Sequence, residues 1–157
     1  LEMDVRDTVL LANAESIAVE ASMVAYEGVV IAAERDAGSL RTMEENASKF
    51  GTHNIEIIPE ITVEALEKLP TPRLAFIVAQ KSTIENDIVT LLKVNPKIKF
   101  IIYTLELDIL ADIKYLMKKH GVDVTEVMQI AVSKVDKNGV FVAQPAPWMI
   151  TCEVKEK

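Results

Sequence analysis

The sequence is poor in cysteine, histidine and glycine, with one, two and five of these residues in a chain of 157. The thiol of Cys152 has no partner for a disulfide within the chain, which is typical of proteins of a reducing cytoplasm. His53 and His120 lie far apart, and no cysteine or histidine stands near either at metal-ligand spacing, so we expect no metal site. No hydrophobic run approaches the length of about 20 residues that a membrane helix requires, so we expect no membrane segment.

Positive charge is also scarce. Lys and Arg number 17 against 24 Asp and Glu, which gives a net charge of −7 and argues against a nucleic-acid partner, because binding phosphates requires clustered basic residues. Half of the residues are hydrophobic and about a quarter are charged, a composition typical of a folded domain with a large core. We expect a single domain over residues 3–157, with Met3 as the natural start and Leu1 and Glu2 outside the fold.

Short apolar runs alternate with segments of helical periodicity five times along the chain. The predicted strands cover residues 8–12, 29–33, 54–58, 74–79 and 98–103, and each is followed by a predicted helix. The runs at 29–33 and 74–79 are apolar throughout, as parallel strands are when helices cover both faces of a sheet. The pattern predicts an α/β fold with a parallel sheet and right-handed crossovers.

The last third of the chain has a different character. Residues 124–135 and 140–154 read as extended segments joined by Asp136-Lys137-Asn138-Gly139, which is strong turn chemistry. They should pair as an antiparallel hairpin that places one strand against the direction of the others. Five β-α units followed by such a hairpin predict the three-layer, Rossmann-like sheet of class I methyltransferases. Its exposed, Val-, Ile- and Met-rich edge and Trp148 predict a homo-oligomer.

The turn between the first strand and the first helix, within residues 8–20, is where ligands of such folds normally bind. It contains no glycine. Asn13 is a reasonable N-cap for the helix, and Glu15 falls in its first turn, where a carboxylate suits the helix dipole.

The sequence resembles the decarboxylating precorrin-6Y methyltransferase family of cobalamin biosynthesis. The resemblance runs in register over nearly the whole chain and is carried by residues 16–21, 29–35, 46–55, 64–72, 129–133 and 147–150. It implies S-adenosylmethionine (SAM) as cofactor, bound at the carboxyl ends of the first four strands, a tetrapyrrole substrate and a homo-oligomeric assembly.

The resemblance also implies a set of cofactor-binding residues. Glu34 matches the acid that accepts hydrogen bonds from both ribose hydroxyls, although a solvated carboxylate at a strand end is an equally good interpretation. Glu60 and Ile61 lie near the segment that frames the adenine. Asn13 and Glu15 fall in the first ligand-binding turn, and Gln80 falls in a second turn after the fourth strand.

The chain departs from the family in both turns. Val9, Leu11, Asn13 and Glu15 stand at the positions of the family's Asp-x-Gly-x-Gly-x-Gly, and residues 78–82 replace its Gly-Gly-Ser-Gly-Gly. The family's segment before the first strand is also largely absent. Glu15 places a negative charge where the SAM carboxylate would lie, a repulsion of a few kcal/mol at an effective dielectric near 20. A loss of about 4 kcal/mol would move a micromolar ligand to the millimolar range.

Three functions therefore stay open. The first is a SAM-dependent C-methyltransferase of corrin biosynthesis, for which we assign no catalytic residue because such catalysis depends mainly on orientation of the methyl donor. The second is a non-catalytic binding or oligomerisation module of the same fold that no longer binds SAM. The third is a domain for another small ligand, with Asn13, Gln80 and Lys81 as polar contacts.

Overall fold

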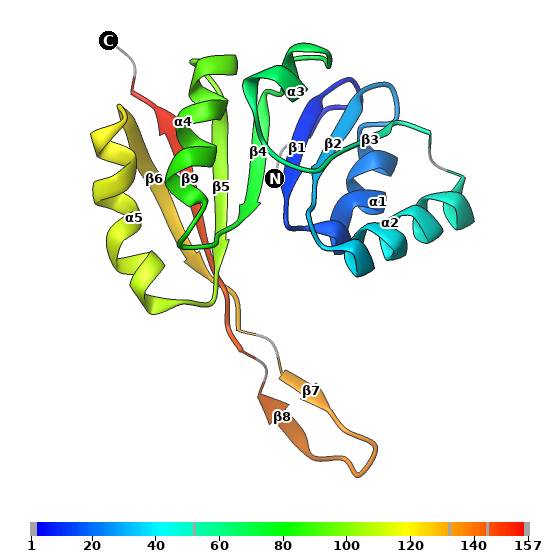
Figure 1. Ribbon diagram of the computed structural model, residues 1–157. Helices are drawn as coiled ribbons and strands as arrows, with labels where there is room; N and C mark the ends of the chain where they lie inside the picture. The colour runs from blue at the N-terminus through cyan, green and yellow to red at the C-terminus, as the bar shows by residue number, and fades with distance from the viewer. Residues whose placement is uncertain (1–2, 52, 132, 144, 156–157) are drawn as a thin grey trace.

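The computed structural model describes residues 3–51, 53–131, 133–143 and 145–155, apart from the side chains of residues 15, 16 and 19. Its elements alternate as the sequence predicts (Figure 1). In chain order they are β1 (Thr8–Ala12), α1 (Glu15–Val24), β2 (Val29–Ala33), α2 (Ala37–Phe50), β3 (Ile55–Ile58), α3 (Val63–Glu67), β4 (Leu74–Val78), α4 (Ile84–Val94), β5 (Lys99–Thr104), α5 (Leu107–Lys119), β6 (Val122–Gln129), β7 (Ser133–Val135), β8 (Phe141–Ala143) and β9 (Trp148–Val154).

Seven strands form the central sheet in the order β3-β2-β1-β4-β5-β9-β6. The five strands from β3 to β5 pair in parallel, because a helical crossover follows each predicted strand. β9 lies between β5 and β6 and is antiparallel to both. The prediction of a mostly parallel α/β sheet that ends in an antiparallel hairpin is confirmed.

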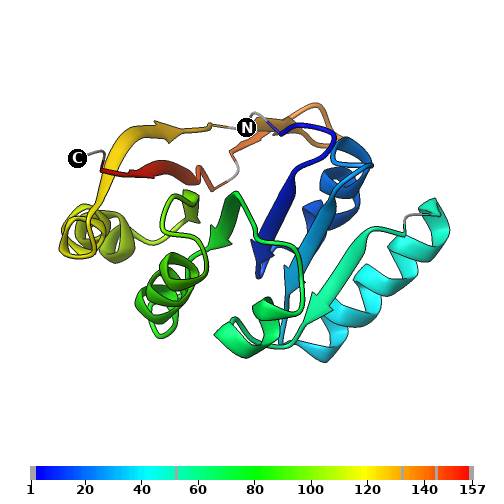
Figure 2. The ribbon, with the colours of Figure 1, turned by 90° about the horizontal axis from the view of Figure 1, so that it is seen from above.

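Helices cover the sheet on two sides and give the three layers (Figure 2). On one face, α1 and α2 pack through small residues such as Ala18 and Ala21 and through Met43. On the other face, α3, α4 and α5 bury Leu66, Ile88 and Met117 against the strands, together with a larger set of Ile, Leu and Phe side chains. None of the helices in the described part of the chain is both long and apolar enough to cross a membrane.

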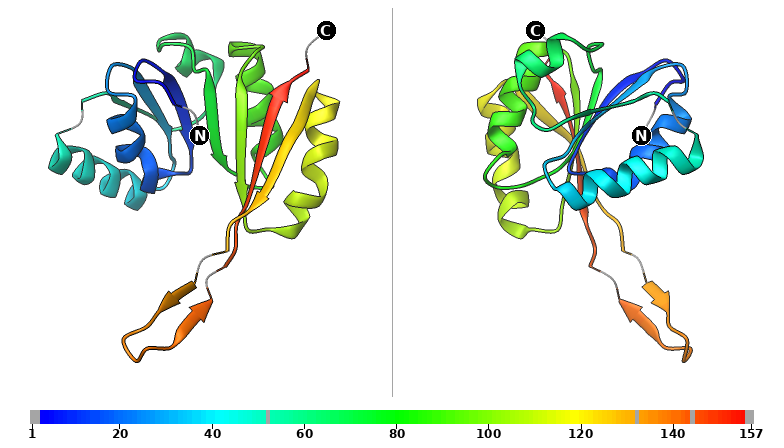
Figure 3. Two further views of the ribbon diagram at one scale, coloured as in Figure 1. Left: turned by 180° about the vertical axis from the view of Figure 1, so that it is seen from behind. Right: turned by 45° about the vertical axis from the view of Figure 1, so that its right-hand side comes forward.

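The terminal hairpin has two parts. β6 and β9 pair within the main sheet, with an irregularity between Val124 and Glu126. Beyond them β7 and β8 form a separate two-stranded ribbon that projects away from the body of the domain (Figures 1 and 3). The turn at its tip is fixed by Asp136, whose Oδ1 accepts hydrogen bonds from the main-chain N–H groups of Asn138 and Val140 at 2.8 and 2.9 Å. Cys152, on β9, is fully buried, and burial raises the pKa of its thiol to about 12.

The neighbours β1 and β4 are also joined at their amino ends. The Arg73 guanidinium donates to both carboxylate oxygens of Asp7, with Nε–Oδ1 and Nη2–Oδ2 distances of 2.8 Å. This hydrogen bonding holds the pKa of the Asp7 carboxyl below its ordinary value. This ion pair fixes the amino ends of the paired strands β1 and β4. The candidate site lies at the carboxyl ends of the same two strands.

Candidate functional site

The sheet has a topological switch point between β1 and β4. The chain leaves β1 through α1 on one face of the sheet and leaves β4 through α4 on the other face. The two connections diverge, so a crevice opens outside the carboxyl ends of these strands, which is where ligands of open α/β sheets bind. The side chains that line it come from residues directly after β1, β2, β3 and β4, and from the start of α4.

Asn13 is not the N-cap of α1, and that prediction is wrong. Ala14 occupies the cap position and makes no side-chain cap hydrogen bond. Asn13 instead has a left-handed backbone with φ of 58°, a conformation that Asn tolerates better than most residues and that glycine adopts freely. Its Nδ2 donates to Val78 O at 3.3 Å, so the side chain reaches from the end of β1 to the end of β4.

An ion pair crosses the neighbouring part of the cleft. The Arg35 guanidinium, just after β2, binds the Glu60 carboxylate, just after β3, and both side chains are more than half exposed. Ile61 packs into the core below them with 5% of its surface exposed. The remaining cavity measures about 30 Å³. This is about the space of one water molecule in the liquid, whereas ligand pockets usually hold about 300–1,000 Å³.

Asp87 is a third charged residue of the cleft, beside Arg35 and Glu60. It lies half-buried in the first turn of α4, among the residues that line the cavity. Burial raises the pKa of its carboxyl to about 6, although the positive charge of Arg35 acts in the opposite direction. Its protonation therefore responds to pH in the physiological range.

The carboxylate of Glu34 is buried and hydrogen-bonded to the main chain. It follows the last residue of β2 and is 7% exposed. Its Oε1 accepts a hydrogen bond from the main-chain N–H of Asp36 at 3.0 Å. The alternative interpretation of Glu34 as a solvated carboxylate is wrong for this conformation, because the side chain is buried. Its role toward a ribose stays a prediction.

Of the six residues expected from the sequence, Asn13, Glu60, Ile61 and Gln80 line one cleft. Glu15 is the first residue of α1, and its side chain lies outside the described residues. Among the other residues that line the same cleft, sequence reasoning missed three polar ones: Arg35, Thr83 and Asp87. Arg35 could have been found from its position directly after Glu34. Asp87 could not, because whether its side chain faces the cleft depends on the residue at which α4 begins. Across the described residues, no group of three or more His, Cys, Asp or Glu is placed to hold a metal ion.

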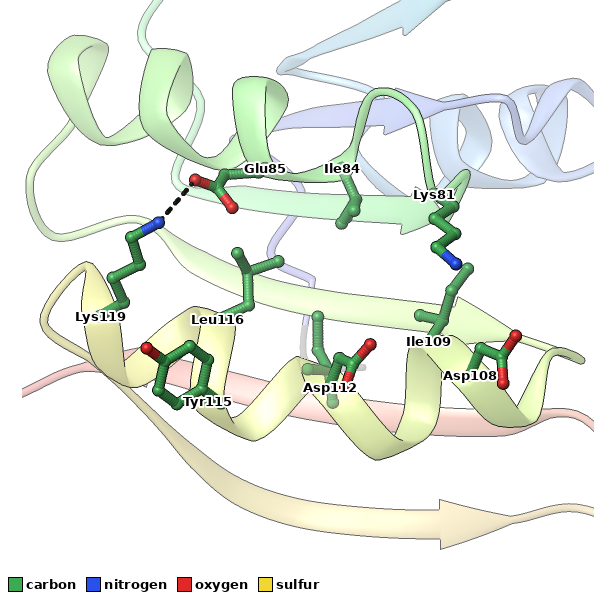
Figure 4. A pocket seen from close by; sticks show the side chains of 10 residues that line it. Lys81, Ile84, Glu85, Asp108, Ile109, Asp112, Tyr115, Leu116 and Lys119 are labelled. Carbon is green, nitrogen blue, oxygen red and sulfur yellow. Dashed lines mark hydrogen bonds and ion pairs between the residues drawn. The ribbon is translucent and has the colours of Figure 1, made fainter.

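A larger groove lies between α4 and α5, with a volume of about 390 Å³ (Figure 4). Its floor is apolar and includes Ile84 and Ile109, and its far end is closed by an ion pair between Lys119 Nζ and Glu85 Oε1 at 3.1 Å. Lys81 lines this groove, whereas Asn13 and Gln80 line the cleft, and a shared role of the three toward a ligand stays a prediction.

Comparison with known proteins gives one family. The model of the family described as precorrin methyltransferase domain matches residues 10–154 of this chain. No curated protein matches the sequence.

Solved structures share the fold. A precorrin-6y C5,15-methyltransferase from Geobacter metallireducens GS-15 is 24% identical with a TM-score of 0.85, over 99% of this chain and 84% of that one. A precorrin 8W decarboxylase from Methanobacterium thermoautotrophicum is 18% identical with a TM-score of 0.77, over 95% and 82% of the two chains. M. capricolum TrmK, in complex with S-adenosyl-homocysteine (SAH), is 12% identical with a TM-score of 0.68, over 98% and 65%.

Proposed function

This chain belongs to the family of precorrin methyltransferase domains, and from that membership we propose that it serves corrin biosynthesis as a methyltransferase-like domain whose SAM site is strongly weakened. Its substrate class would be a tetrapyrrole, which an active member of the family would methylate on carbon. The observation that carries the proposal is the filled cleft at the carboxyl ends of β1 to β4.

Two contacts in that cleft support a weakened SAM site. The Asn13 side chain bridges the carboxyl ends of β1 and β4, and the Arg35–Glu60 pair bridges the carboxyl ends of β2 and β3. The cavity that remains, about 30 Å³, is smaller than the roughly 300–1,000 Å³ of ordinary ligand pockets, which supports a weakened site. The absence of glycines from the first turn supports the same conclusion from the sequence, because side chains occupy space that the ligand needs.

A thermal-shift measurement with SAM and SAH at millimolar concentration tests the proposal. A ligand at about 100 times its dissociation constant adds about 2.7 kcal/mol to the free energy of unfolding. We expect a small or absent shift for this chain, and a large shift at micromolar SAH would refute the weakened site. If a shift occurs, Glu34→Ala should remove most of it, since this carboxylate is the expected ribose acceptor. An unchanged shift would show that Glu34 has no such role.

The second candidate is a non-catalytic module that assembles into homo-oligomers in the cytoplasm. The single cysteine, which has no disulfide partner within the chain, supports that location. The ribbon of β7 and β8 favours it. Val135, Val140 and Phe141 are 57%, 56% and 77% exposed on this ribbon, and an isolated two-stranded ribbon is marginally stable in water. Phe141→Asp should lower the molar mass measured by light scattering, whereas Tyr115→Asp, at an exposed residue of α5, should leave it unchanged. A monomeric wild-type chain would contradict this candidate.

A further inference from the structure

Asn13 joins the end of β1 to both of its neighbouring strands. Its main-chain N–H donates to Ala33 O, at the end of β2, at 3.1 Å. Its side-chain Nδ2 donates to Val78 O, at the end of β4, at 3.3 Å. One half-buried residue thereby connects the carboxyl ends of β2, β1 and β4 at the switch point.

The Arg35–Glu60 ion pair makes a second bridge in the same cleft. Arg35 follows the end of β2 and Glu60 follows the end of β3, so the pair connects two further strand ends above Ile61. The two bridges together span the ends of β1, β2, β3 and β4, which are the strand ends that a ligand in this crevice would touch.

We infer that these two bridges are built-in substitutes for a bound ligand, so that the chain's own side chains hold the crevice closed without a cofactor. The inference rests on the proposed function, because it takes this crevice to be the SAM site of the family. The inference also gives Asn13 a structural role. Asn13 joins β1 and β4 at their carboxyl ends, and the Asp7–Arg73 pair joins them at their amino ends.

The two bridges differ in strength. An exposed ion pair contributes at most about 1 kcal/mol, so opening the Arg35–Glu60 pair should change ligand affinity by about fivefold at most. Asn13 is less exposed, and its amide bridges the carboxyl ends of β1 and β4 at the switch point. Its left-handed backbone also means that glycine can replace it without strain. Asn13 should therefore be the main obstacle to a ligand, and Arg35 the lesser one.

Hydrogen exchange of the ligand-free protein tests the bridges directly. In Asn13→Gly, the main-chain amides of residues 13 and 34, which donate to Ala33 O and Ile58 O, should exchange about tenfold faster than in the wild type. Asn95→Ala is the control, because it removes a similar bond, from Asn95 Nδ2 to Pro72 O at 2.9 Å, together with the bond from Lys97 N–H to Asn95 Oδ1, at the amino ends of β4 and β5. It should leave the crevice amides unchanged. Equal exchange in the wild type and Asn13→Gly would overturn the inference.

Titration with SAH gives the second readout. The double variant Asn13→Gly/Arg35→Ala should bind SAH at least about tenfold more tightly than the wild type, while Asn95→Ala should match the wild type. A folded double variant with wild-type affinity would overturn the inference and leave the proposed function intact. Micromolar binding of SAH by the wild type would refute the weakened SAM site of the proposed function. The hydrogen-exchange measurement would then still decide whether the two bridges close the crevice.

Discussion

Asp87 reports on whether the cleft is closed, without any ligand. Its carboxyl lies beside the Arg35–Glu60 pair, and burial raises its pKa from 3.8 to about 6. In an open, hydrated cleft the carboxyl would not be buried, and its pKa would lie near the ordinary value of an aspartate. The titration of Asp87 therefore distinguishes a closed cleft from an open one.

The sign of the effect on stability follows from linkage. The folded-state pKa lies above the unfolded one, so the contribution of Asp87 is most favourable below about pH 4 and is lost as the pH rises toward 6. Above pH 6 the ionised carboxylate lowers the free energy of unfolding by about 1–2 kcal/mol, a figure reduced for its partial contact with solvent. Asp87→Asn should remove this cost and raise the melting temperature at pH 7.5 by about 2–8 °C.

Urea unfolding of the wild type and Asp87→Asn at pH 4.5, 6 and 7.5 measures the difference, and carboxyl-carbon NMR shifts give the pKa itself. The gain from the substitution should grow with pH between the first two points and then level off. Asp112→Asn, at an exposed aspartate of α5, is the matched control. If Asp87→Asn destabilises the protein at pH 7.5, or if Asp87 titrates near pH 4, the carboxylate is hydrated or well paired and the closed cleft is wrong.

Three further substitutions test the framework around the site. Gly28→Ala should lower the free energy of unfolding by about 2–4 kcal/mol, because the new Cβ would lie 2.0 Å from the main-chain oxygen of Asp7. A urea midpoint equal to that of the wild type would contradict this. Asp7→Asn should lower the free energy of unfolding at neutral pH and make it depend less on pH in the acid range. Arg73 lowers the pKa of Asp7, which gives stability above about pH 4 that is lost as the pH falls through the folded-state pKa. An unchanged dependence of stability on acid pH would contradict this. Asn54→Ala should cost about 1–2 kcal/mol, because its Nδ2 donates to two main-chain oxygens near the end of α1, and amide exchange there should rise with it.

The order of the elements could be predicted because each one leaves a local pattern. The unbroken apolar runs of β2 and β4 identify strands buried on both faces, and Asp136 to Gly139 identifies the turn of the terminal hairpin. The division of that hairpin into a sheet part and a projecting ribbon could not be predicted, because Val127 and Val142 read alike as strand residues. What separates them is long-range pairing: Val127, on β6, pairs with β9 and so joins the main sheet, whereas Val142, on β8, pairs with β7.

The location of the site could also be predicted, because the carboxyl ends of parallel strands meet at one edge. Asn13, Glu60 and Gln80 were placed there from the sequence and line one cleft in the structure. Their contacts could not be predicted. The helix-cap interpretation of Asn13 failed because the residue adopts a left-handed turn and its amide reaches Val78. Such a bond depends on the separation of strand ends that are 65 residues apart in sequence.

An NMR titration of the wild-type chain with SAH, followed at the main-chain amides of Asn13, Glu34 and Gln80, tests most directly the proposal that the cleft is closed to SAM. These three residues come from the ends of β1, β2 and β4, so a bound nucleoside would perturb them together. We predict no saturable change at these amides up to about 1 mM SAH. Saturation of all three at micromolar SAH would contradict it.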